Sequence, residues 1–173
     1  MIGYMGSGKT TLGRAFAKAA RLQFIDLDWY IEERMHKTVS ELFAERGESG
    51  FREVEKNMLH EVGEYEDVVI AAGGGTPCFF DNMEYMNRMG STVFLDASTE
   101  TLLRRLKIGK SKRPLLAGKT DDELRETIVG ALEKRMPFYG MAKYRFRADE
   151  LEDRKQISQS VNRLGELLDI EIV

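Results

Sequence analysis

The sequence predicts an α/β protein in which a parallel sheet is flanked by helices. Short apolar runs of strand length alternate along the chain with longer segments of helical period. Residues 67–72 form the clearest strand, because a continuous apolar run is typical of a strand that is buried on both faces. The chain has 173 residues, of which 42% are hydrophobic, so we expect one domain over residues 1–173.

Each expected element follows from its own local pattern. Thr38 and Glu41 have the spacing of a capping box, which predicts a helix over residues 40–46 that ends at Gly47. Pro137 is expected to end another helix. The other predicted helices are 10–20, 29–35, 50–64, 82–89, 99–106, 121–136 and 154–168. The predicted strands are 23–27, 67–72, 92–96 and 144–147.

The composition excludes several classes of function. Lys and Arg total 26 against 29 Asp and Glu, and the net charge of -3 gives no general attraction to nucleic acid or an anionic membrane. No apolar run is long enough to predict a spanning helix. His36, His60 and Cys78 lack partners at metal-ligand or nucleophile spacing, so structural or exposed roles are expected. A lone cysteine and no visible secretory signal favour a reducing, cytoplasmic setting.

A phosphate-binding loop opens the chain. Residues 3–10 read Gly-Tyr-Met-Gly-Ser-Gly-Lys-Thr, which fits the pattern of Gly, four free positions, Gly, Lys and a hydroxyl residue. In such a loop, backbone N–H groups surround phosphate oxygens, Lys9 adds positive charge, and the Thr10 hydroxyl is placed to bind Mg²⁺. A flexible glycine turn is the alternative. Only Met1 and Ile2 precede the motif, so the first strand is expected to be a stub or to have lost N-terminal residues.

Asp26 and Asp28 stand where a predicted strand gives way to a helix. Alternate residues of a strand share one face, so both carboxylates are expected to point into a cleft at the carboxyl end of the sheet. One could hold Mg²⁺ through water, and the other could accept a proton from a substrate hydroxyl or orient that hydroxyl. The alternative is that Asp28 only caps the next helix.

Two further features suit the binding of a ligand. Arg52 could hold a carboxylate through parallel hydrogen bonds, although a surface ion pair with Glu48 or Glu55 is the simpler explanation from spacing alone. The run Gly73-Gly74-Gly75 follows the buried strand and indicates that a ligand approaches the backbone closely, with a plain tight turn as the alternative.

Arg113 and Arg135 could also contact a ligand, but each has a simpler structural alternative. Residues 107–119 are rich in lysine and are a candidate lid, in which Arg113 could close over phosphates. A solvated run of charge is the alternative. Arg135 lies near the end of the predicted helix 121–136, where interaction with the helix dipole would account for it.

Taken in order along the chain, these motifs resemble the shikimate kinase family, small P-loop enzymes of aromatic amino-acid biosynthesis. The resemblance implies a three-layer fold of nucleoside-monophosphate-kinase type with a parallel five-stranded sheet. It also implies a mobile lid at about 107–119 and a substrate-binding helical region at about 28–60. The implied activity is ATP-dependent phosphorylation of the 3-hydroxyl of shikimate, which gives shikimate 3-phosphate and ADP on the route to chorismate. The implied enzyme is a cytoplasmic monomer that uses Mg²⁺ and has no nucleic-acid or membrane partner.

The resemblance also assigns roles residue by residue. The residues similar to the family's ATP phosphate cradle are Gly6, Ser7, Gly8, Lys9, Thr10 and Thr11. Those similar to its Mg²⁺ site are Thr10 and Asp26. Those similar to its shikimate site are Asp28, Arg52, Gly73, Gly74, Gly75 and Arg135. Arg105, Arg113 and Arg154 resemble further ATP contacts, and the catalytic roles fall to Lys9, Asp28 and Arg113.

Two other functions remain open from the sequence. A kinase of the same fold for gluconate or a nucleoside monophosphate is the nearest alternative, and the paired arginines and the triple glycine count against it. The other is a non-catalytic module that binds ATP for regulation.

Overall fold

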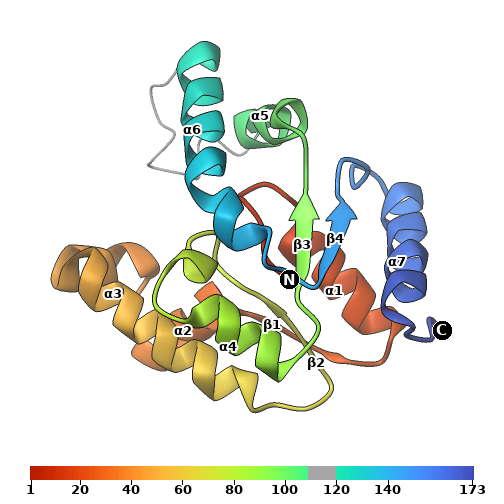
Figure 1. Cartoon of the computed structure of the whole chain (residues 1–173), viewed down its shortest axis with the longest axis horizontal. Helices are drawn as coiled ribbons and strands as arrows, with labels where there is room; N and C mark the ends of the chain where they lie inside the picture. Colours follow the sequence, from red (N-terminus) through yellow and green to blue (C-terminus); the bar gives the residue numbers. More distant parts are fainter. Residues whose placement is uncertain (109–119) are drawn as a thin grey trace.

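A computed structural model describes residues 1–108 and 120–173, where helices and strands alternate as predicted (Figure 1). The α-helices are α1 (Lys9–Ala19), α2 (Leu27–Met35), α3 (Val39–Gly63), α4 (Asn82–Met89), α5 (Thr99–Ile108), α6 (Asp121–Tyr139) and α7 (Arg154–Leu168). A 3₁₀ turn, η1 (Thr76–Cys78), lies between β2 and α4. The strands are β1 (Gln23–Asp26), β2 (Val68–Ala71), β3 (Val93–Asp96) and β4 (Tyr144–Arg147). In this part of the chain no helix is both long and apolar enough to cross a membrane.

The strands form two separate parallel pairs, which corrects the expectation of one five-stranded sheet. β1 pairs with β2, and β3 pairs with β4, each over four residues. Between the two pairs, the segment before the phosphate loop makes an isolated parallel bridge, from Ile2 to Phe94, and not a continuous ladder.

Met1 and Ile2 nevertheless join the two pairs, and we call these two residues the seam. On one side the Ile2 N–H donates to the Val93 carbonyl, and the Ile2 carbonyl accepts from the Leu95 N–H, both at 2.9 Å. On the other side the Met1 carbonyl accepts from the Ala72 N–H at 3.0 Å. The seam therefore connects β3 with the carboxyl end of β2, directly before the phosphate loop.

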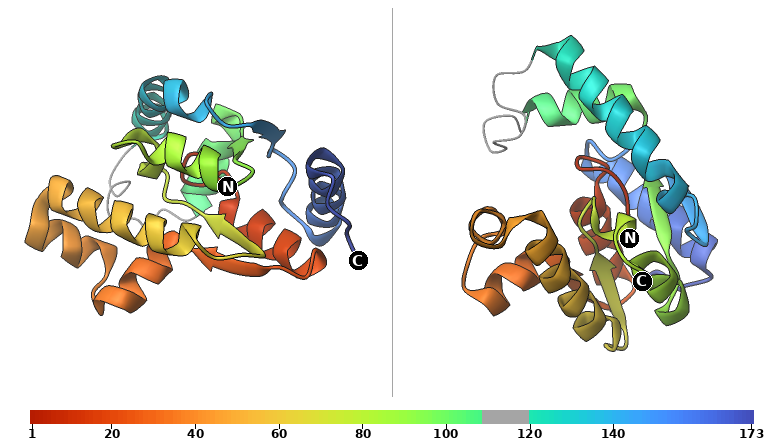
Figure 2. Two further views of the ribbon diagram at one scale, coloured as in Figure 1. Left: turned by 60° about the horizontal axis from the view of Figure 1, so that its bottom comes forward. Right: turned by 60° about the vertical axis from the view of Figure 1, so that its left-hand side comes forward.

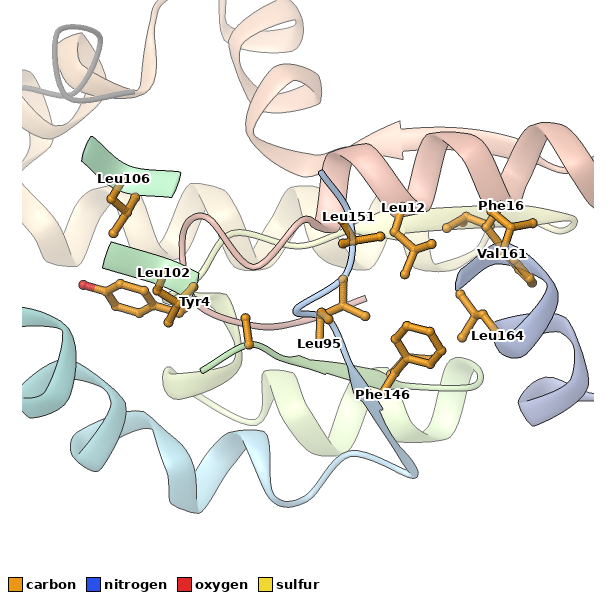
Figure 3. Packing of buried hydrophobic residues seen from close by; sticks show 14 of the residues in the cluster. Tyr4, Leu12, Phe16, Leu95, Leu102, Leu106, Phe146, Leu151, Val161 and Leu164 are labelled. Carbon is orange, nitrogen blue, oxygen red and sulfur yellow. The ribbon is translucent and has the colours of Figure 1, made fainter. Parts of the chain in front are cut away.

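Helices cover both faces of the sheet region. One hydrophobic cluster packs α1, α5 and α7 against Val93 and Leu95 of β3, and a second packs α2, α3 and α4 around Phe94 of the same strand. Alternate residues of β3 therefore face opposite layers, as the strand geometry requires. α1 lies beside α7, and α3 lies beside α4 (Figure 2). Figure 3 shows the first cluster, in which side chains of α1 and α7 converge with Phe146 of β4.

The start of α3 confirms the predicted capping box. The Thr38 hydroxyl accepts from the Glu41 N–H, and the Glu41 carboxylate accepts from the Thr38 N–H. Gly47 breaks the helix as expected, because its φ of 67° and ψ of -180° are not helical, and a second helix follows directly within the range Val39–Gly63. The two helices predicted on either side of Gly47 therefore abut without a loop between them.

Pro137 does not end its helix, which corrects another expectation, because α6 continues to Tyr139. A proline inside a helix removes one hydrogen bond, the one its N–H would have donated to the carbonyl four residues earlier. Here the loss falls in the last turn, which the Gly140 N–H closes by donating to the Met136 carbonyl at 2.8 Å. The extra residues bring Tyr139 into the core.

Candidate active site

A cleft of about 680 Å³ lies where the phosphate loop, the end of β1 and the glycine run meet. The predicted site residues that line it are Gly6, Gly8, Lys9, Thr10, Thr11, Asp26, Asp28, Gly73, Gly74 and Arg105. A second cleft, of about 470 Å³, lies between α3, α4 and the amino ends of β2 and β3, and none of the predicted site residues lines it. Ten of the predicted site residues therefore line one cleft, whereas Ser7, Arg52, Gly75, Arg135 and Arg154 do not line it.

The phosphate loop leads directly into α1. Gly8 precedes the helix at a φ of 98°, a conformation that other residues rarely adopt, so the backbone conformation favours glycine here. The first turn of α1 contains no acidic side chain, which leaves its positive end suited to an anion. The Lys9 ammonium donates to the carbonyls of Gly3 and Tyr4 at 2.8 and 3.1 Å, and so lies across the loop.

Ser7 contributes to this loop in a different way from its neighbours. Its side chain is buried, and its hydroxyl has no hydrogen-bond partner among the described residues. Its N–H donates to the Tyr4 carbonyl at 3.1 Å. Ser7 therefore supports the turn from within, whereas Thr10 and Thr11 lie at the surface of the cleft.

Asp26 connects the phosphate loop with α2. The Thr10 hydroxyl donates to Asp26 Oδ2 at 2.8 Å, and Asp26 Oδ1 accepts from the Asp28 N–H at 3.2 Å. Asp26 is thus the residue that caps α2, which leaves the Asp28 carboxylate out of the capping role. A hydroxyl and a carboxylate oxygen are ligands that Mg²⁺ accepts, with water and phosphates completing its coordination. Thr10 and Asp26 therefore fit the predicted metal site.

Asp28 lies deeper in the cleft, beside the glycine run. Its Oδ1 is 3.1 Å from the position that a Cβ on Gly73 would take. Burial and the nearby negative charges of Asp26 and Glu55 together raise the pKa of Asp28 to about 6, against the opposing charge of Lys9. A carboxylate with a pKa just below neutrality is suited to accept a proton from a hydroxyl group.

Arg52 faces the run Gly73–Gly75, which we call the glycine turn. A Cβ on Gly75 would lie 2.6 Å from Arg52 Nη2, so glycine is needed for the guanidinium to approach. Arg52 pairs with Glu55 at 2.7 Å and more weakly with Glu48 at 3.5 Å, but its side chain is only 12% exposed. The ion pair between Arg52 and Glu55 is therefore present, but it is largely buried and does not lie on the surface. Among the described residues, Arg52 Nε is buried and has no hydrogen-bond partner.

Glu55 is a functional residue that the sequence reasoning missed. Its side chain is 1% exposed, and it accepts from Arg52 through Oε2 and from the Thr76 hydroxyl through Oε1 at 2.6 Å. Asn82 donates in turn to the Thr76 carbonyl at 2.9 Å. The sequence does contain a signal for this residue, because Glu55 follows Arg52 by three positions. That spacing also predicts a simple surface ion pair, which was the alternative to a role of Arg52 in ligand binding. The structure shows that the ion pair orients the arginine.

Arg135 reaches the glycine turn from α6. A Cβ on Gly74 would lie 3.2 Å from Arg135 Nη1. The guanidinium also lies over the ring of Tyr4 in the phosphate loop, 5.3 Å from its centroid. Arg52 and Arg135 therefore approach neighbouring glycines from two different helices, and we call these two arginines with the glycine turn the carboxylate clamp.

Arg105 and Arg154, predicted to contact the same ligand, have very different positions. Arg105 Nη1 donates to the Gly6 and Ala148 carbonyls at 3.2 and 2.9 Å, and its Nε pairs with Glu152 at 2.8 Å. These bonds tie the phosphate loop to the segment before α7. Arg154 is exposed at the start of α7 and does not line the cleft.

The remaining predictions concern the expected lid, metal ligands, and the two histidines and the cysteine. Arg113 and nearly all of the expected lid lie outside the described residues. Among the described residues, no group of three or more His, Cys, Asp and Glu side chains could hold a metal ion. His36 is exposed at the end of α2, His60 stacks on Tyr85, and Cys78 is partly buried with a free thiol.

A phosphate loop on one side of the glycine turn and two arginines on the other give the chain the cleft of a kinase, and its architecture is that of an α/β P-loop kinase. The family model described as shikimate kinase matches residues 5–165. The chain belongs to the shikimate kinase family.

Individual relatives cover almost the whole chain. A shikimate kinase of Bacteroides thetaiotaomicron is 66% identical over 170 residues, which make up 98% of this chain and 97% of the relative. A crystal structure of shikimate kinase from that organism matches with a TM-score of 0.95 and covers 98% of this chain and 96% of the other. Shikimate kinase from Acinetobacter baumannii in complex with shikimate matches with a TM-score of 0.82 at 31% identity, covering 97% of this chain and 90% of the other.

Proposed function

We propose that this protein transfers the γ-phosphoryl group of ATP to the 3-hydroxyl of shikimate, producing shikimate 3-phosphate and ADP for the synthesis of chorismate and aromatic amino acids. The observation that carries this proposal is the carboxylate clamp, where Arg52 and Arg135 approach Gly75 and Gly74 beside the phosphate cleft. A small hydroxylated acid held there by its carboxylate can place a ring hydroxyl near Asp28.

The phosphate side of the cleft supplies positive charge at fixed positions. The N–H groups at the start of α1 and the Lys9 ammonium bind the β- and γ-phosphates of ATP, and Arg105 holds the outer side of the loop in place. Thr10 and Asp26 would hold Mg²⁺. When bound, Mg²⁺ neutralises charge on the phosphate oxygens during transfer.

On the substrate side, Asp28 binds ring hydroxyls and accepts the proton of the hydroxyl that attacks the γ-phosphorus. Its raised pKa, to about 6, leaves it ionised at neutral pH and still basic enough to share the proton during the transfer. By resemblance to the family, Arg113 closes over the transferring phosphoryl group. The same resemblance supports a lid at about 107–119 and a contact of Arg105 with adenine.

Finer features of the fold are also proposals. We infer that the seam holds the two strand pairs in one layer, which its hydrogen bonds to Val93, Leu95 and Ala72 support. The lone Cys78 supports a reducing cytoplasm, and the sequence has no evident zipper, which favours a monomer.

The test is ADP release from ATP and Mg²⁺ with shikimate, gluconate and nucleoside monophosphates offered separately, beside a control without acceptor. We expect release with shikimate alone. Release with gluconate or a nucleotide instead would assign the protein to another small-molecule kinase. ATP binding without turnover on any acceptor would favour the regulatory module.

A further inference from the structure

Tyr139 is a buried residue at the end of α6 to which the motifs assign no role. Its side chain is 0% exposed, its ring stacks on Phe94 with centroids 5.0 Å apart, and its hydroxyl donates to the Gly74 carbonyl at 2.6 Å. Tyr139 follows Arg135 by four residues, so both side chains lie on the same face of α6. This face meets the glycine turn.

The environment keeps the hydroxyl in its donating form. Burial raises the pKa of Tyr139 to about 12, and the charge and hydrogen bond of Arg135 oppose that shift only in part. The phenol is therefore protonated at every pH where the protein is expected to work. Its hydrogen bond to Gly74 and its proximity to Arg135 connect two parts of the carboxylate clamp.

The bond to Gly74 also fixes the direction of a neighbouring donor. The Gly74 carbonyl and the Gly75 N–H belong to one planar peptide and point in opposite directions. Glycine has unusual backbone freedom, so this peptide would otherwise rotate readily. No hydrogen bond within the described residues uses the N–H groups of Gly74 and Gly75. Holding the carbonyl therefore holds a free donor of the turn in one orientation.

We propose that Tyr139 is a positioning residue for substrate, whose hydroxyl sets the glycine turn and Arg135 in the arrangement that receives a carboxylate. This inference rests on the proposed function, because it assumes that the clamp binds the carboxylate of shikimate. It goes beyond that function by assigning part of the substrate affinity to a side chain that does not line the phosphate cleft. Glu55 and Thr76 hold Arg52 in an analogous way.

The test variant is Tyr139→Phe, which keeps the ring and its stacking on Phe94. We expect KM and Kd for shikimate to rise about five- to tenfold, the effect of one lost hydrogen bond in a binding site, while kcat and KM for ATP change less than about twofold. For an analogue of shikimate without its carboxylate, we expect wild type and variant to bind equally. A merely structural role would weaken both ligands alike.

The matched control is Tyr85→Phe. Tyr85 is 7% exposed and its hydroxyl donates to the His60 carbonyl at 3.0 Å, so the change removes a comparable bond outside the phosphate cleft. Shikimate binding is expected to be unchanged in this variant, and thermal melting of both variants measures the cost to folding. Unchanged shikimate affinity in Tyr139→Phe overturns the inference alone. Wild-type protein that binds no shikimate overturns the proposed function as well.

Discussion

The two sides of the cleft are built in different ways. The phosphate loop is one stretch of eight residues, Gly3–Thr10, and it offers mainly backbone groups whose direction follows from local conformation. The carboxylate clamp offers side chains from α3 and α6, which meet only at the glycine turn. The phosphate side therefore depends on permitted backbone angles, and the substrate side depends on buried residues that hold each arginine.

The largest effect is expected from the phosphate side. Lys9→Ala should lower kcat about a thousandfold, because it removes the charge that faces the transferring phosphate. Shikimate binding measured by calorimetry should change little, since Lys9 is not part of the clamp. If this variant kept its turnover and lost shikimate affinity instead, the division between the two sides would be wrong.

The next largest effect should come from the clamp. Arg52→Ala should raise KM for shikimate about a hundredfold, with a smaller loss of kcat, because the variant removes a buried hydrogen-bonding charge. KM for ATP should stay near the wild-type value. Glu55→Gln is the informative companion, because it keeps the shape of the side chain and removes only the charge that orients Arg52. Wild-type kinetics in Glu55→Gln would show that Arg52 needs no such support.

A change of pH should have an intermediate effect on kcat/KM for shikimate. Because burial raises the pKa of Asp28 to about 6, kcat/KM for shikimate should fall below pH 6, about tenfold per pH unit. Asp28→Asn should remove this limb of the profile together with most of the activity. A profile that stays flat from pH 7 to about 5 would exclude Asp28 as the base.

The same shift has a consequence for stability. A carboxyl pKa raised on folding means that the native state binds more protons than the unfolded state between about pH 3.9 and 6, so stability falls as pH rises through that window. Asp28→Asn should therefore increase the free energy of unfolding at pH 7 by about 1–2 kcal/mol, and by almost nothing at pH 4, in denaturant titrations. An equal gain at both pH values would point to a cause other than ionisation.

The smallest effect should distinguish two arginines on the ATP side. Arg154→Ala should change KM for ATP less than about twofold, because its exposed side chain lies outside the cleft. Arg105→Ala should raise that KM more than about tenfold, since it releases the outer side of the phosphate loop. A rise of about tenfold in KM for ATP in Arg154→Ala as well would mean that Arg154 contacts the nucleotide.

The contrast between the two sides also decides what the sequence could predict. The phosphate loop, the strand-end carboxylates and the capping box at Thr38 are local patterns, and local conformation suffices to place them. The pairing of Arg52 with Arg135 is not local, because it depends on how α3 and α6 pack, and only the resemblance suggested it. From spacing alone, a surface ion pair and a helix dipole were the simpler explanations.

The residues that were missed have a common physical character. Glu55 and Tyr139 are buried polar side chains that each make a hydrogen bond to a distant residue, Thr76 at 21 positions and Gly74 at 65, so no motif contains both ends of either bond. The end of α6 was predicted wrongly at Pro137 for a related reason. Local rules end a helix at proline, but the packing of Tyr139 in the core stabilises the turn beyond it.

The seam joins the two strand pairs and makes fewer hydrogen bonds to each pair than hold the strands together within it. Each strand pair has its own ladder of backbone hydrogen bonds, whereas a few hydrogen bonds from Met1 and Ile2 join the pairs. Under tension the sheet should open along this line before either pair separates, because cooperative units part where the fewest contacts connect them. The phosphate loop begins at the next residue, so a nucleotide that tightens the loop should also reinforce this junction between the two strand pairs.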